Sequence, residues 1–185
     1  WDFSTNTNAC GPYAPAVVAL QATDARYYPD PAYTTLVDQL AAWHGVAVSR
    51  ILLGASGSEL IQRRAIASAL SGQRTVSVPV HAYGDYARAA QAAGLRQVDD
   101  PSHAALIWAC EPSSPLGRAQ ASLADLVVGL RGGQVLVLDE AYAPLRLSGV
   151  ASLDAHALDR VWRLISPNKA LGLTGVRAAY IILPA

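Results

Sequence analysis

The chain has 185 residues, of which 52% are hydrophobic and 15% charged, and its formal net charge at pH 7 is zero. This composition predicts a globular domain with a real hydrophobic core and excludes a disordered tail. A neutral chain without a basic run lacks the electrostatic footprint of a nucleic-acid-binding protein. No stretch reaches the uninterrupted apolar length of a membrane span, so we expect neither nucleic acid nor a membrane as a partner.

The positions of the cysteines and histidines narrow the class of protein further. Cys10 and Cys110 lie far apart and form no C-x-x-C pair, which favours a reduced protein with two buried, inert thiols over a disulfide scaffold. The four histidines are scattered singly, so we expect no metal site. The first eight residues lack the basic start and apolar run of a signal peptide. These features predict a soluble, cytoplasmic protein.

The first 30 residues are rich in Asn, Pro and Tyr, and they predict an irregular N-terminal arm rather than a domain of its own. Three stretches beyond the arm have apolar residues at helical spacing and stop at or near a glycine. These expected helices cover residues 32–44, 58–70 and 83–93. Residues 31–185 are therefore expected to form one large domain.

Apolar runs with little alternation separate and follow the expected helices. They predict strands at residues 75–78, 104–109, 134–138, 160–165 and 178–183. Strands of this kind are buried on both faces, which favours an α/β fold with a mostly parallel sheet covered by helices on each side. Ligand sites in such sheets lie at the carboxyl ends of the strands.

Polar segments follow three of the expected strands. Asp139 ends one strand, Lys169 lies in a small-residue turn after another, and Arg177 follows eight positions later; the turn from Glu111 to Gly117 follows a third. An amine that can form a Schiff base, an arginine for a phosphate and a carboxylate for a pyridine nitrogen are the groups that bind pyridoxal phosphate. Lys169 is the only lysine of the chain.

The order and spacing of these segments resemble the fold-type I pyridoxal-phosphate enzymes, in the branch that contains histidinol-phosphate aminotransferase and threonine-phosphate decarboxylase. The segments that carry the resemblance are Asp2–Asn8 with Gly11-Pro12, Tyr28–Pro31, Gly54–Leu60, Tyr83–Tyr86, Pro112–Gly117, Asp139–Tyr142 and Lys169–Arg177. The resemblance implies a three-layer α/β/α large domain that works as a homodimer. It also implies a small C-terminal domain, which the 185 residues do not contain.

The resemblance assigns roles to individual residues. Lys169 matches the lysine that forms the Schiff base with pyridoxal 5′-phosphate and moves a proton. Asp139 matches the aspartate that pairs with the ring nitrogen, and Tyr142 the tyrosine that reaches the phenolic oxygen. Tyr83 matches the aromatic residue that stacks on the ring. Ser114 stands where the family has an asparagine that donates to the phenolic oxygen.

Further roles concern the phosphate and the substrate. The expected phosphate ligands are Gly57, Ser58, Ser166, Asn168 and Arg177, together with Tyr28 from the neighbouring subunit. Asn168 stands where Ser or Thr is usual in the family. Asn8 is a candidate substrate contact.

Each of these residues also has a purely structural interpretation. Asp139 could end a strand or cap a helix, Ser58 could be a plain N-cap, and Arg177 could form a surface ion pair. The tyrosines could be core or turn residues, and Asn8 could form a turn. For Lys169 the alternative is an ordinary surface lysine.

The resemblance implies an aminotransferase that uses an amino donor and a 2-oxo acid acceptor and acts on an amino acid or amino-phosphate. Two alternatives stay open: a lyase similar to the threonine-phosphate decarboxylase of cobalamin biosynthesis, and a catalytically incomplete relative that only binds the cofactor. A Rossmann dehydrogenase is disfavoured because the Gly-x-Gly-x-x-Gly turn is missing, and a serine hydrolase because no Gly-x-Ser-x-Gly elbow is present.

Overall fold

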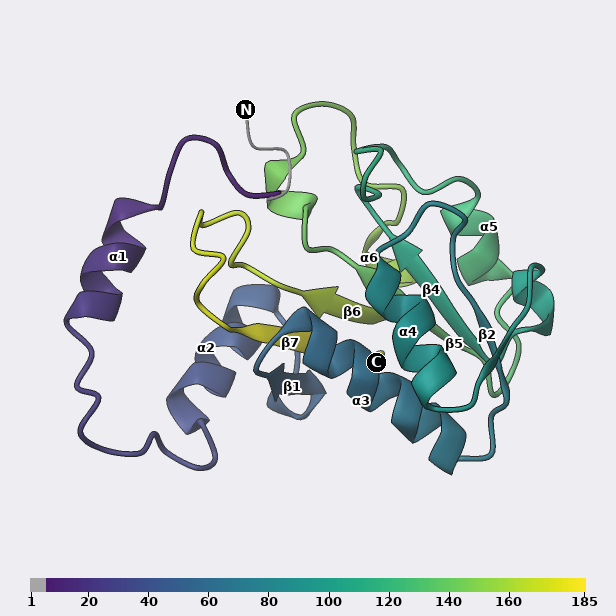
Figure 1. Ribbon diagram of the computed structural model, residues 1–185, viewed down its shortest axis with the longest axis horizontal. Helices are drawn as coiled ribbons and strands as arrows, with labels where there is room; N and C mark the ends of the chain where they lie inside the picture. Colours follow the sequence, from purple (N-terminus) through teal and green to yellow (C-terminus); the bar gives the residue numbers. More distant parts are fainter. Residues whose placement is uncertain (1–5) are drawn as a thin grey trace.

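The computed structural model describes residues 6–185 (Figure 1). Residues 1–5, which hold most of the Asp2–Asn8 segment, lie outside the described residues. The helices are α1 (Ala14–Gln21), α2 (Thr34–His44), α3 (Gly57–Leu70), α4 (Gly84–Ala92), α5 (Leu123–Val128) and α6 (Ala155–Leu158). The strands are β1 (Ile51–Gly54), β2 (Thr75–Ser77), β3 (Arg96–Gln97), β4 (Leu106–Cys110), β5 (Val135–Asp139), β6 (Trp162–Ile165) and β7 (Ala179–Ile182). Short 3-10 turns occupy Val48–Arg50, Pro101–His103 and Ala143–Leu145.

The seven strands form one sheet in the order β1-β7-β6-β5-β4-β2-β3. The pairs β2 with β3, β2 with β4, β4 with β5 and β5 with β6 are parallel, whereas β7 is antiparallel to both of its neighbours. The expected α/β fold with a mostly parallel sheet is confirmed. Because β4, β5 and β6 run in the same direction, their carboxyl ends meet at one edge of the sheet.

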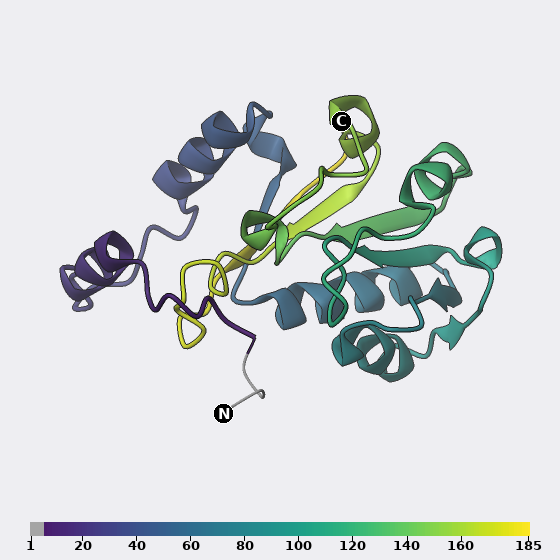
Figure 2. The ribbon, with the colours of Figure 1, turned by 90° about the horizontal axis from the view of Figure 1, so that it is seen from above.

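Side-chain alternation along the central strands builds two separate cores. Leu106, Trp108 and Val137 pack beneath α3 and α4, whereas their chain neighbours Ile107 and Leu136 pack against α5 on the opposite face. Figure 2 shows the sheet edge-on between these helices. The expected three layers are therefore present, and both faces of the central strands are covered.

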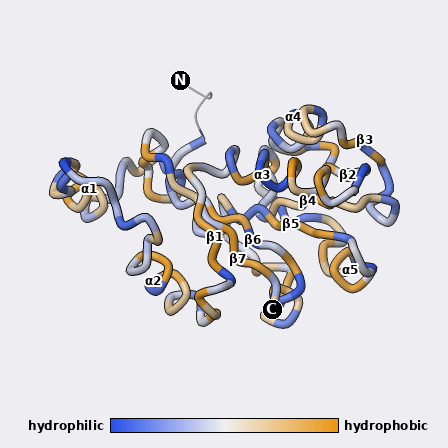
Figure 3. Tube along the Cα trace, turned by 90° about the horizontal axis from the view of Figure 1, so that it is seen from below, coloured by the Kyte–Doolittle hydropathy of each residue, from blue (hydrophilic) through white to orange (hydrophobic). Residues whose placement is uncertain are grey.

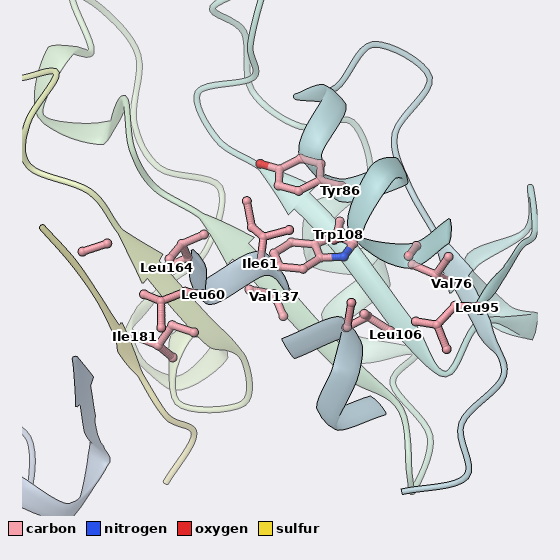
Figure 4. Packing of buried hydrophobic residues seen from close by; sticks show 14 residues of the cluster. Leu60, Ile61, Val76, Tyr86, Leu95, Leu106, Trp108, Val137, Leu164 and Ile181 are labelled. Atoms are coloured by element: carbon pink, nitrogen blue, oxygen red, sulfur yellow. The ribbon is translucent and has the colours of Figure 1, made fainter. Parts of the chain in front are cut away.

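The central strands are the most apolar part of the chain, as the hydropathy colours in Figure 3 show. All five residues of β4 are buried. In the core beneath α3 and α4, the rings of Tyr86 and Trp108 stack with centroids 4.7 Å apart and an interplanar angle of 9° (Figure 4). Aromatic stacking and apolar burial together fix α4 on the sheet.

Several elements differ from the sequence-based expectation. The N-terminal arm is not irregular throughout, because α1 forms within it, although none of its residues is buried. Strands β1 and β3 and helices α5 and α6 were also not expected. Of the two cysteines, Cys110 is buried as expected but Cys10 is exposed, so the expectation of two buried thiols is wrong for Cys10. Within residues 6–185, every helix is too short or too polar to cross a membrane.

Candidate functional site

A cavity of about 280 Å³ lies at the carboxyl ends of β4, β5 and β6. The residues that line it are Asn6, Gly57, Ser58, Ile61, Tyr83, Tyr86, Cys110, Ser114, Asp139, Ala141, Tyr142, Leu164, Ser166, Asn168, Lys169, Thr174 and Arg177. The structure thus brings together ten of the predicted site residues from segments that span most of the chain. Parallel strands deliver their following loops to the same edge, which is why residues so distant in sequence share one cavity.

Helix α3 begins at this cavity. The hydroxyl of Ser56 caps the helix by accepting a hydrogen bond from the Glu59 amide at 3.1 Å, and the first regular helical bond runs from the Leu60 amide to the Ser56 carbonyl. The amides of Gly57 and Ser58 precede that bond and have no partner within the helix. They present free N–H groups and the positive end of the helix dipole to the cavity.

A serine hydroxyl and an arginine lie near this helix end. Ser166 directly follows β6 and donates from its hydroxyl to Oδ1 of Asn168 at 2.9 Å, with both residues buried. Arg177 lines the same cavity, and its guanidinium donates only to the Thr174 carbonyl, at 3.3 Å, among the bonds of residues 6–185. Most of its N–H groups are thus available to a ligand, and the end of the cavity near α3 carries positive charge.

Asp139 ends β5 at the floor of the cavity and is 7% exposed. Its Oδ1 accepts a hydrogen bond from the Ala141 amide at 2.9 Å, and its Oδ2 accepts one from the Tyr86 hydroxyl at 2.6 Å. Burial raises the pKa of Asp139, while the bonds from Tyr86 and Ala141 and the charge of Lys169 act in the opposite direction. A cationic partner in the cavity would favour the ionised carboxylate.

The Lys169 ammonium lies between two tyrosine rings, 4.8 Å from the centroid of Tyr142 and 5.7 Å from that of Tyr83. None of the ion pairs formed by residues 6–185 involves this lysine. An amine held by aromatic faces instead of a carboxylate is available for chemistry.

The turn that carries Lys169 is held by the arm. The Asn8 amide donates to the Lys169 carbonyl at 3.1 Å, and the Asn8 side chain donates to the Ala170 carbonyl at 3.1 Å. Gly172 has a positive φ of 67°, and a Cβ there would lie 2.6 Å from the Gly11 carbonyl oxygen. A glycine is required at 172 because the arm backbone passes so close.

Two predicted residues lie outside the cavity. Asn8 holds the Lys169 turn, as described, and does not line the cavity. Tyr28 is fully exposed and also does not line it. Tyr83 lies at the rim, where its hydroxyl is 3.1 Å from that of Ser58.

Sequence reasoning assigned no role to Tyr86 or Cys110, which also line the cavity. Burial, followed by the nearby charge of Asp139, raises the pKa of the Cys110 thiol to about 12, so it stays protonated and is a poor nucleophile. The spacing of Tyr83 and Tyr86 around the start of a helix is a signal that could have drawn attention to the second tyrosine. Its partner Asp139 lies 53 residues away and no local pattern reveals it.

A second, larger cavity of about 730 Å³ adjoins the first and shares Asn6, Ser114 and Tyr142 with it. Its walls come mainly from residues 112–119 and 145–150. The buried carboxylate of Glu111 joins these two loops, because its Oε1 accepts hydrogen bonds from Arg146 at 3.0 Å and from the Ser152 amide at 2.9 Å.

Comparisons with known proteins place the chain among aminotransferases. No protein-family model matches it. Histidinol-phosphate aminotransferase of Ruegeria pomeroyi is 30% identical over 203 residues, covering 98% of the chain and 56% of the relative. The crystal structure of histidinol-phosphate aminotransferase from Sinorhizobium meliloti in complex with pyridoxal-5′-phosphate superposes with a TM-score of 0.81. The chain is a fold-type I aminotransferase-like protein.

Solved structures of other proteins share the fold of this aminotransferase-like chain. The Sinorhizobium meliloti structure is 23% identical, covering 97% of the chain and 55% of that protein. The crystal structure of L-threonine-O-3-phosphate decarboxylase from Porphyromonas gingivalis has a TM-score of 0.78 at 21% identity, covering 97% of the chain and 61% of that protein. The chain spans about half the length of the relatives it matches.

Proposed function

We propose that the chain binds pyridoxal 5′-phosphate and acts, in the whole protein, in the transfer of amino groups from an amino donor to a 2-oxo acid. The observation that carries this proposal is the content of the 280 Å³ cavity, which unites Lys169, the buried Asp139, and a helix N-terminus beside Arg177. An amine, a carboxylate and an anion site are the three groups that the cofactor requires.

The residues at the α3 end of the cavity fit a phosphate. The amides of Gly57 and Ser58, the Ser58 hydroxyl and the guanidinium of Arg177 can all donate hydrogen bonds, and helix N-termini bind anions. Ser166 would join them by turning its hydroxyl from Asn168 to the phosphate. A Cβ at position 57 would lie 3.9 Å from the Ser166 Oγ, so positions 57 and 166 are close neighbours at this end of the cavity.

Asp139 would hold the ring nitrogen of the cofactor. When bound, pyridoxal phosphate supplies an electron-withdrawing ring that stabilises negative charge at the substrate Cα. An ionised Asp139 would keep the ring nitrogen protonated and thus strengthen that withdrawal. Tyr142 and Ser114 line the cavity with hydroxyls that would support the phenolic oxygen, and Tyr83 at the rim would cover the ring face.

Lys169 would hold the cofactor through its aldehyde, because it lines the cavity and is the only lysine among the 185 residues. Its Nζ is also the group placed to take a proton from the substrate Cα and return one. The two tyrosine rings around Nζ limit the directions that the amine can take. In this proposal Asn8 acts indirectly, since its hydrogen bonds fix the turn that carries the lysine.

We further propose a homodimer in which Tyr28 reaches the phosphate site of the neighbouring subunit. Tyr28 is fully exposed, and no residue of α1 is buried, so the arm leaves its apolar side chains free for a partner surface. The substrate would be an amino acid or an amino-phosphate. Sedimentation velocity measures the oligomeric state directly.

The cofactor proposal is tested by titrating the purified chain with pyridoxal phosphate, reducing the mixture with borohydride and mapping the labelled peptide. We expect a visible absorbance band in the wild-type chain and a reduced label on Lys169. Lys169→Ala should lose the band and the label completely, because no other side-chain amine exists.

Adventitious labelling has a clear signature in this experiment. Nonspecific reaction would fall on the α-amino group at the N-terminus of the purified protein, and it would label the N-terminal peptide in both proteins. A second control, Arg177→Gln, should keep the label on Lys169 but weaken cofactor binding, because it removes a phosphate donor. A label found only on the N-terminal peptide, or a band that survives in Lys169→Ala, would disprove the proposal.

A further inference from the structure

The carboxylate of Asp139 is fixed on both of its oxygens. Oδ1 accepts from the Ala141 amide at 2.9 Å, a bond within the loop that follows β5. Oδ2 accepts from the Tyr86 hydroxyl at 2.6 Å, a bond that reaches across from α4. Two donors on different oxygens determine the rotation of the carboxylate about its last bond, so its remaining lone pairs have set directions.

Tyr86 is itself held firmly. Its side chain is 0% exposed, and its ring stacks on Trp108 at 4.7 Å (Figure 4). It also meets the ring of Tyr83 edge to face, with centroids 5.9 Å apart. The hydroxyl is its only polar atom, and it points out of the apolar core toward Asp139. This packing fixes the ring of Tyr86 and holds its hydroxyl oxygen beside Asp139.

Among residues 6–185, Tyr86 is the only side chain that donates a hydrogen bond to Asp139, and this donor is neutral. Besides Tyr86 on α4, the titratable groups that face it are Cys110 at the end of β4 and Lys169 in the turn after β6. Burial raises the pKa of Tyr86 well above its ordinary value, so its hydroxyl stays a donor. A donor to a carboxylate favours its ionised form.

We propose that Tyr86 is a positioning residue: its hydroxyl orients Asp139 and keeps it ionised, so that the cavity selects a ligand with a protonated ring nitrogen. This inference rests on the proposed function for the identity of that ligand. The contact between Tyr86 and Asp139 does not depend on it. The bond joins the ring-stacking side of the cavity, at Tyr83 and α4, to its floor at β5.

The test is Tyr86→Phe, which keeps the ring on Trp108 and removes only the hydroxyl. In the cofactor-free chain, carbon-13 NMR of the Asp139 carboxyl should show a higher pKa in this variant than in the wild type. In binding experiments, the wild type should prefer pyridoxal phosphate to its 1-deaza analogue, which lacks the ring nitrogen. The variant should lose roughly tenfold of that preference, as expected when a hydrogen bond to a charged group is removed.

Two controls separate positioning from general stability. Tyr180→Phe removes another partly buried hydroxyl, the one bonded to His44 at 2.9 Å, and should leave both measurements unchanged. In an Asp139→Asn background, Tyr86→Phe should have no further effect on the preference, because the residue through which Tyr86 acts is already altered.

The outcomes distinguish this inference from the cofactor proposal. If the wild type binds pyridoxal phosphate but Tyr86→Phe changes neither the Asp139 titration nor the preference, the positioning role is overturned. If the wild type does not bind the cofactor at all, the proposed function fails, and the NMR titration alone decides whether Tyr86 controls Asp139. An equal loss of preference in Tyr180→Phe would also overturn it, since the effect would then be one of stability.

Discussion

The central strands of the sheet and the N-terminal arm differ in how much of their surface is buried. Strand β4 is buried along its whole length, and β5 nearly so, and both are packed by helices on each face. In the arm, of which residues 6–30 are described, helix α1 has no buried residue, and Figure 2 shows it beside the sheet rather than on it. The central strands are stabilised by burial, which the arm largely lacks.

The arm is attached through hydrogen bonds at one place. The Asn8 and Tyr13 amides donate to the carbonyls of Lys169 and Leu171, at 3.1 and 2.8 Å. The arm therefore contacts the domain at the turn that carries the proposed cofactor lysine. We therefore expect the arm to add little to the stability of the domain, although its hydrogen bonds place it to affect the site.

The largest expected difference between the two regions concerns apolar side chains. Leu106→Ala in β4, at a residue that is 0% exposed, should lower the free energy of unfolding by about 2–5 kcal/mol through lost burial and a cavity. Val18→Ala on α1, at a residue that is 64% exposed, should change it by less than about 0.5 kcal/mol. Urea unfolding monitored by circular dichroism measures both. Equal losses would show that the arm is packed in solution.

The same contrast explains which elements could be predicted from the sequence. The strands near 75–78, 104–109 and 134–138 were found because burial on both faces imposes an unbroken apolar run. Strand β3 has two exposed polar residues, and its pairing is set by its neighbour β2 rather than by any pattern of its own. Helix α1 was not predicted, because the Asn, Pro and Tyr residues around it are typical of irregular structure.

The site was predictable where chemistry is carried by short motifs. Lys169 and Asp139 come from segments whose order and spacing matched a family, and the structure places both in one cavity. The bond from Tyr86 to Asp139 was not predictable, because it depends on how deeply α4 packs against β5. The placement of Asn8 against the Lys169 turn likewise depends on the path of the arm.

The loss of an ion pair should also affect stability differently in the two regions, by an intermediate amount. Glu111→Ala should destabilise the chain by about 1–3 kcal/mol, because it leaves the largely buried Arg146 without its partner and frees the Ser152 amide. Although burial alone would raise the pKa of Glu111, its bonds from Ser152 and Arg146 hold that pKa below its ordinary value. Asp24→Ala breaks the exposed pair with Arg26 in the arm and should give no measurable change. Chemical denaturation measures the free energy of unfolding of both variants. An unchanged free energy of unfolding in Glu111→Ala would contradict the expectation.

The smallest expected effect is a pH dependence of opposite sign in the two regions. Burial raises the pKa of Asp139, so the folded chain keeps this proton to higher pH than the unfolded chain does. Its contribution to stability is therefore fully present below the ordinary aspartate pKa and is lost as the pH rises toward the raised value. Hydrogen bonds from the Thr34 and Ala32 amides lower the pKa of Asp30 in the arm. Its contribution is present above the ordinary pKa and is lost as the pH falls through the lowered value.

Asp139→Asn and Asp30→Asn remove one titration each, so the difference from the wild type isolates each contribution. The free energy of unfolding of the cofactor-free chain is measured at pH values from below 3.8, the ordinary aspartate pKa, up to neutrality. The stability of the wild type relative to Asp139→Asn should fall with rising pH, and its stability relative to Asp30→Asn should rise. A flat difference for Asp139→Asn would mean that Tyr86, Ala141 and Lys169 together cancel the cost of burying the carboxylate.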